Sequence, residues 1–99
     1  MDVAKGDVQL GNRTQTIVAG VCDFGINDIA TTLIKDHDAD IAIVVNPKSG
    51  TVSFRRAKDC RTPLHKLAAT LAGGGGHEAS AGGKITDTFL EFTKILKNV

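Results

Sequence analysis

The sequence contains one stretch whose residue types could bind an anion. Residues 71–85 read LAGGGGHEASAGGKI, in which consecutive glycines, Gly73 to Gly76, run directly into His77. Consecutive glycines can turn successive backbone N–H groups toward one anion, because they tolerate positive φ and carry no β-carbon to block its approach. We interpret this run as a phosphate-binding loop. Its backbone would supply the donors, and His77 at its end would add a ring N–H.

A flexible linker and a tight structural crossing are the alternatives for the glycine run. Poly-glycine is usually a linker, because glycine loses the most backbone entropy on ordering. Here the run follows a helical pattern and leads into an apolar segment that a compact core needs. It is no Walker loop, since no Lys-Ser/Thr follows, and no dinucleotide fingerprint, since it does not follow a strand. The small residues of 77–82 could open a helical turn and aim further N–H groups at the same anion.

A second cationic group comes from the segment TVSFRR. Val52 and Phe54 alternate with Ser53 and Arg55, so a strand here points the Arg55 guanidinium away from the core. A planar guanidinium beside an anion loop suits bidentate phosphate binding. Arg56 follows and adds a further charge. A solvated charge on an edge strand is the alternative for Arg55.

The elements that position these residues follow from the hydrophobic periodicity. Residues 1–14 are polar without a clear period, so we interpret them as a loose lead-in or linker remnant, and residues 15–99 as one domain. The patterns predict strands over 15–24, 39–46, 51–55 and near 82–85, and helices over 25–37, 62–73 and 86–99. This order predicts an α/β or α+β domain, with a mixed sheet of about four to five strands packed by about three helices.

Terminal residues mark the ends of the predicted helices. We expect Asn27 to cap the first helix and Thr62 the second, with Gly73 ending the second in the left-handed conformation. Lys94 and Lys97 suit the C-terminal end of the last helix dipole.

Composition restricts the class of ligand. The 99 residues carry a formal charge of +1, whereas a protein that grips a long duplex through its phosphates usually shows a basic bias. The charge therefore favours a localised anion site. Cys22 and Cys60 lack zinc-site spacing, and Cys22 is expected to be a buried thiol. The sequence shows no signal peptide and no apolar run of about 20 residues. We therefore expect a cytoplasmic protein without membrane contact.

Other polar residues offer weaker candidates for chemistry. The segment KDHDAD, residues 35–40, superficially resembles a metal cluster, but it contains a single histidine and is expected to be a solvated turn. His65 is expected to lie on the surface. Glu78 could act as a general base, yet nothing in the sequence activates it.

The segments GTVSFRRAKD and AGGGGHEASAGGKI, separated by a short helical pattern, resemble the C-terminal DHH-associated domain of the DHH (Asp-His-His) phosphoesterases. That family's pattern is a strand ending in Ser-hydrophobic-Arg-Ser, a helix, and then Gly-Gly-Gly-His-x-x-Ala-Ala-Gly. The matching residues are Ser53, Phe54, Arg55, Gly74, Gly75, Gly76, His77, Ala81 and Gly82. The resemblance covers residues 16–97. Arg56 and Ser80 depart from it, standing where the family usually has serine and alanine.

The resemblance implies a substrate-binding role. The family includes RecJ-like exonucleases, nano-RNases and cyclic-dinucleotide phosphodiesterases, in which this domain holds the nucleotide and its phosphate. A separate DHH domain, here in cis or in trans, would bind two Mn²⁺ or Mg²⁺ ions and perform the hydrolysis. This chain itself is expected to hold no catalytic residue, metal or cofactor. The implied phosphate-binding residues are Arg55, Gly74, Gly75, Gly76 and His77, with Ser53, Arg56, Gly73 and Ser80 as further candidates.

Rival functions stay open at this point. The chain could be a stand-alone, non-catalytic nucleic-acid-binding or nucleotide-sensing module that works with a partner protein. It could also be a small regulatory domain in which the glycines only form a tight crossing. The ligand could be DNA, RNA, a cyclic dinucleotide or a mononucleotide, and an exposed hairpin edge could pair with a second copy.

Overall fold

The computed structural model describes residues 3–99, which form an α+β fold around a seven-stranded mixed sheet. The strands are β1 (Val3–Leu10), β2 (Arg13–Val21), β3 (Ile41–Asn46), β4 (Thr51–Arg56), β5 (Gly75–His77), β6 (Ser80–Lys84) and β7 (Lys97–Asn98). The helices are α1 (Ile26–His37), α2 (Leu64–Ala72) and α3 (Asp87–Thr93). The strand order is β5-β6-β4-β3-β2-β1-β7. The predicted fold class is confirmed, with more strands than the sequence indicated.

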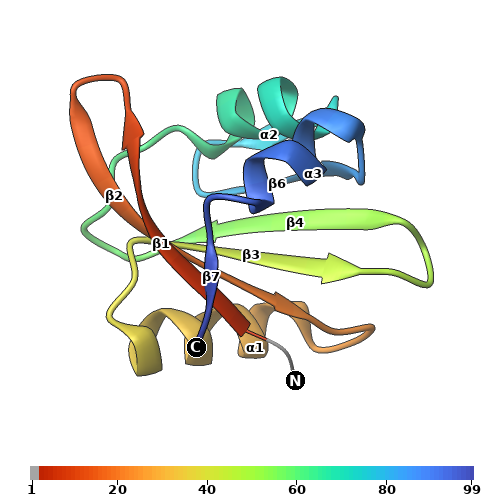
Figure 1. Cartoon of the computed structure of the whole chain (residues 1–99), viewed down its shortest axis with the longest axis horizontal. Helices are drawn as coiled ribbons and strands as arrows, with labels where there is room; N and C mark the ends of the chain where they lie inside the picture. The colour runs from red at the N-terminus through yellow and green to blue at the C-terminus, as the bar shows by residue number, and fades with distance from the viewer. Residues whose placement is uncertain (1–2) are drawn as a thin grey trace.

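The helices divide between the two faces of the sheet (Figure 1). Helix α1 connects the parallel strands β2 and β3 and covers one face, where Val18 and Val44 pack with Leu33. Helices α2 and α3 cover the other face, where Phe54 belongs to the same cluster as Phe89. The central strands β2 and β3 are thus buried on both sides, which explains their nearly continuous apolar sequence.

The first strands form a hairpin that the sequence did not reveal. Val3–Leu10 pairs antiparallel with β2 from Arg13 to Gly20, so the interpretation of residues 1–14 as a loose lead-in is wrong for residues 3–14. Residues 1 and 2 lie outside the described residues. A β-carbon on Gly6 would lie 3.1 Å from Leu96 Cδ2. The glycine that weakened the strand pattern therefore allows the chain after α3 to pack closely on β1.

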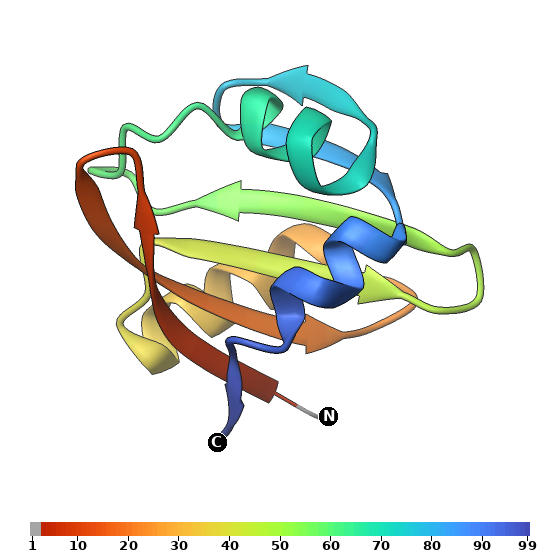
Figure 2. The same ribbon diagram turned by 45° about the horizontal axis from the view of Figure 1, so that its top comes forward.

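The second half of the glycine run, Gly75 and Gly76, lies in a strand rather than a loop. Gly75–His77 pairs antiparallel with Ser80–Lys84, and β6 pairs in turn with β4. The helical turn expected over 77–82 is therefore wrong, because these residues form a tight turn and a sheet strand. Figure 2 shows this hairpin beside α2, with β5 at the edge of the sheet.

The helix ends differ from the sequence in detail. Gly25 is the N-cap of α1, and Asn27 lies inside the helix. Thr62 does not cap α2, because its hydroxyl donates to Gln15 Oε1 over 3.2 Å. The expected end of α2 at Gly73, with φ of 60°, is confirmed. The last helix ends at Thr93.

The structure also places Lys97 and the two cysteines, and it gives the lengths of the helices. Lys97 lies in β7, so it is not part of a helix end. Cys22 is half-buried, which makes the expected buried thiol wrong there, whereas Cys60 is buried. Among the described residues, no helix is long and apolar enough to cross a membrane.

Candidate phosphate-binding site

The register of the sheet places His77, Ser80 and Arg55 in one cross-strand row. Ser80 on β6 pairs with His77 on β5 and with Arg55 on β4. Directly opposed residues of antiparallel strands have their β-carbons about 4.5–5.5 Å apart on the same face. Arg55 is itself opposite Ala42, which packs in the cluster under α1. The row therefore lies on the face that carries α1, at the end of the sheet formed by β4, β6 and β5.

The neighbouring row on this face is almost free of side chains. Gly75 pairs with Gly82, and Gly82 pairs with Ser53. A β-carbon built on Gly75 would have no other atom within 4 Å. The result is a bare strip of backbone that is bordered by the hydroxyl of Ser53 on one side and by the row of His77, Ser80 and Arg55 along its length.

The guanidinium of Arg55 is held in place by three acceptors. Its Nε donates to Asn27 Oδ1 over 2.9 Å, and its Nη1 donates to Phe54 O over 2.8 Å and to Ala81 O over 3.4 Å. Desolvation by partial burial lowers the pKa of Arg55, but a guanidinium stays charged at neutral pH. Within residues 3–99 it has no carboxylate partner, and its Nη2 donates no hydrogen bond. A fixed cation with a free donor suits an anionic ligand.

The start of α1 lies beside Arg55, at one end of this row. A cavity of about 440 Å³ is lined by the first turn of the helix and by the Arg55 side chain. Gly25, the N-cap of α1, has φ of 67° and no side-chain cap, so the first helical N–H groups remain available to a ligand. Asp28 also lines the cavity, so an anion is favoured on the Arg55 side of it.

Sequence reasoning missed this contribution of α1. The available signal was a glycine between a buried strand and a helix, which is where strand–helix–strand units often bind anions. The contact of Asn27 with Arg55 could not have been found, because it depends on the angle at which α1 crosses the sheet.

The fold itself requires three of the glycines in the run. Gly73 has a φ of 60° and Gly76 a φ of 140°. A β-carbon on Gly74 would lie 2.0 Å from Gly82 O. The N–H groups of Gly73 and Gly74 both donate to Ala68 O. Their amides are therefore engaged within the chain, and the donors left for a ligand are those on the outer side of β5, the edge strand.

Arg56 does not join the site. Strand alternation points it to the opposite face, where its Nη1 donates to Thr62 O over 2.9 Å. His65 is half-buried rather than on the surface, and its Nδ1 has no hydrogen-bond partner among the described residues. Glu78 is exposed in the β5–β6 turn, and its carbonyl accepts from Leu64 N over 2.8 Å.

Residues 35–40 form the end of α1 and the approach to β3. Asp38 is the C-cap of α1, with φ of 51°, and the Asp40 carboxylate accepts a hydrogen bond from Thr16 N over 2.8 Å. Across residues 3–99, no group of three or more His, Cys, Asp or Glu side chains is arranged to hold a metal ion.

No model of a known protein family and no curated protein matches this chain. Solved structures do match it. An uncharacterized protein from Helicobacter pylori G27 is 25% identical with a TM-score of 0.64, over 90% of this chain and 27% of that one. An exopolyphosphatase-related protein from Bacteroides fragilis is 16% identical with a TM-score of 0.58, over 81% of this chain and 26% of that one. The chain therefore spans about a quarter of the length of these proteins, and it has the fold of one part of each.

Proposed function

We propose that this chain is a substrate-binding domain that holds the phosphate of a nucleotide or oligonucleotide for a separate, metal-binding DHH domain, which hydrolyses the phosphodiester. The observation that carries the proposal is the row of His77, Ser80 and Arg55 beside the bare strip at Gly75 and Gly82. A row of donors on one face, with backbone exposed next to it, is an arrangement that a phosphate can approach closely.

In this proposal the phosphate lies on the strip at Gly75. Arg55 Nη2 donates a charge-assisted hydrogen bond, and the His77 ring donates a second one from the edge strand. The Ser80 hydroxyl lies between them in the same row. Because Asn27 and the sheet carbonyls already fix the guanidinium, little side-chain entropy is lost when the anion binds.

The division of labour has two supports. Two divalent ions need several carboxylate or imidazole ligands gathered in space, and residues 3–99 hold no such cluster. The solved structures with this fold are about three times as long, and the name of one of them refers to an exopolyphosphatase. Both observations agree with a binding domain that serves chemistry done elsewhere.

An NMR titration of the whole chain tests the proposal. Short single-stranded DNA, short RNA and nucleoside monophosphates are added in separate series, and each is followed at the amides of Gly75 and Gly76 and at the His77 ring. We expect these signals to shift together with the Arg55 Nε signal, and the ligand that saturates them first identifies the substrate class. If these signals stay still while others move, the site lies elsewhere.

A further inference from the structure

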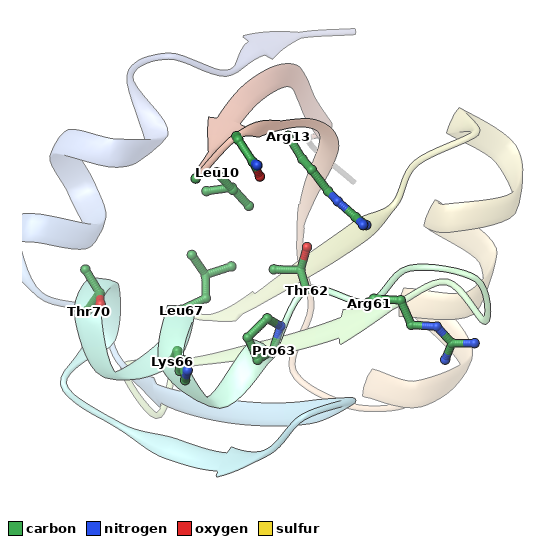
Figure 3. A pocket seen from close by; sticks show the side chains of 10 residues that line it. Leu10, Arg13, Arg61, Thr62, Pro63, Lys66, Leu67 and Thr70 are labelled. Carbon is green, nitrogen blue, oxygen red and sulfur yellow. The ribbon is translucent and has the colours of Figure 1, made fainter.

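A larger cavity lies on the face of the sheet opposite to His77. It has a volume of about 540 Å³ and lies between the β1–β2 hairpin and the start of α2. Figure 3 shows Leu10 from the hairpin and Leu67 from α2 pointing toward one another across it. Pro63 forms part of the same lining. This volume lies within the range of about 300–1,000 Å³ that is typical of small-molecule sites.

The charged side chains that line this cavity are all positive. Arg13, Arg61 and Lys66 line it, and its lining includes no aspartate or glutamate. None of these cations forms an ion pair within the described part of the chain. The chain as a whole has 12 Lys and Arg against 11 Asp and Glu, so a lining with three cations and no acid is a local concentration of positive charge.

The cations differ in how they reach the cavity. In Figure 3 the Arg13 guanidinium lies between the hairpin and Thr62, at one end of the apolar walls, whereas Arg61 extends away from the cavity. All three cations are exposed, so each can turn toward a bound anion by changing rotamer. Arg13 is the expected main anchor because, unlike Arg61, it does not extend away from the cavity in Figure 3, and the other two are further donors.

We propose that this cavity binds a phosphomonoester attached to an apolar body, with the body between Leu10, Pro63 and Leu67 and the phosphate beside Arg13. The apolar walls explain why a bare anion is not the ligand, and the unpaired cations explain why an uncharged apolar group is not. Nucleoside monophosphates and alkyl phosphates share this chemistry. The inference does not rest on the proposed function, because His77 lies on the other face of the sheet.

The test uses hexyl phosphate, AMP, inorganic phosphate and hexanol as probes of the whole chain. Binding is followed through the methyl signals of Leu10 and Leu67, while the His77 ring reports on the other face in the same spectra. We expect hexyl phosphate, AMP or both to shift the two leucines, and to bind at least tenfold more tightly than hexanol and inorganic phosphate. The better of the two identifies the body as alkyl or nucleoside.

Substitutions of the cations determine which of them binds the phosphate. Arg13→Gln is expected to weaken the better probe about fivefold or more, and Lys66→Gln to weaken it by less. Lys35→Gln is the matched control, because Lys35 is an exposed lysine on α1. Amide spectra of each variant establish that it is folded. The proposal is overturned if the leucine methyls do not respond to either phosphomonoester, if hexanol binds as tightly, or if Arg13→Gln binds like the parent.

Discussion

Arg55 Nε donates a 2.9 Å hydrogen bond to Asn27 Oδ1 and so ties the end of β4 to the first turn of α1. These residues are far apart in sequence, and the bond turns the guanidinium along the sheet rather than out into solvent. It acts together with the carbonyls of Phe54 and Ala81, which accept from Nη1. Asn27 is therefore a positioning residue for the proposed phosphate site.

Replacing Asn27 with alanine should weaken phosphate binding without unfolding the protein. The exposed amide makes a single bond to a charged group, so we expect the affinity for a nucleoside monophosphate to fall by up to about tenfold. Thermal unfolding should stay close to that of the parent. An NMR titration followed at the His77 ring measures the affinity, and Thr32→Ala, an exposed change on the same helix, is the control. Equal affinities for Asn27→Ala and the parent would remove Asn27 from the site.

Adjacent glycines should respond in opposite ways to alanine. In Gly74→Ala the new β-carbon would lie 2.0 Å from Gly82 O, a backbone atom. We therefore expect a loss of about 3 kcal/mol or more in the free energy of unfolding. In Gly75→Ala the new β-carbon meets no atom within 4 Å and φ is not positive, so stability should stay within about 1 kcal/mol of the parent. Urea unfolding measures both.

Gly75→Ala should nevertheless bind phosphate less well. The fold gives no reason for a glycine at this position, whereas a ligand on the bare strip does. A variant that is stable but binds several-fold more weakly would separate the two roles. Unchanged binding would mean that the ligand does not lie on Gly75.

The sequence predicted the elements whose conformation follows from local pattern. It missed those whose conformation depends on contacts between residues far apart in the chain. The alternation of Val52 and Phe54 predicted the strand that carries Arg55, and Gly73 correctly ended the helix. Gly74 to Gly76 were taken as a loop because glycine is disfavoured in strands. Gly75 and Gly76 instead belong to β5, and Gly74 before them approaches Gly82 too closely for any side chain.

Strand β1 was also missed because one of its glycines is explained only by a tertiary contact. Gly6 interrupts its apolar pattern. In the fold Leu96 packs against Gly6, which leaves little room for a β-carbon there. By contrast, the sequence is enough to place Arg55 and Arg56 on opposite faces of the sheet, because successive side chains of a strand alternate between its faces.

Gln15 should contribute to stability through a buried polar contact. Its Oε1 accepts from Cys60 Sγ and from Thr62 Oγ1, each over 3.2 Å, which joins β2 to the segment before α2. Gln15→Ala should therefore lower the free energy of unfolding by about 1–2 kcal/mol. Gln9→Ala is the matched control, because Gln9 makes its hydrogen bonds at the exposed end of the β1–β2 hairpin, and it should change stability by less than about 0.5 kcal/mol. Equal effects would mean that the buried contact adds nothing.

The isolated chain should hydrolyse no phosphodiester, with or without Mn²⁺. Residues 3–99 contain no group of side chains that could hold two metal ions. The measurement is release of mononucleotides from a labelled dinucleotide by rigorously purified protein, with and without a chelator. Turnover that depends on Mn²⁺ and persists through purification would contradict the proposed division of labour.

The central claim is that the face of the sheet that carries His77 binds phosphate, and the adjacent arginines test it most directly. Arg55 and Arg56 have the same charge but point to opposite faces, one toward Asn27 and the other toward Thr62 O. The decisive measurement compares the affinities of Arg55→Gln and Arg56→Gln for the ligand that saturates Gly75 and His77. We expect Arg55→Gln to lose more than about tenfold and Arg56→Gln to bind within about twofold of the parent. Equal losses, or a larger loss for Arg56→Gln, would contradict the account.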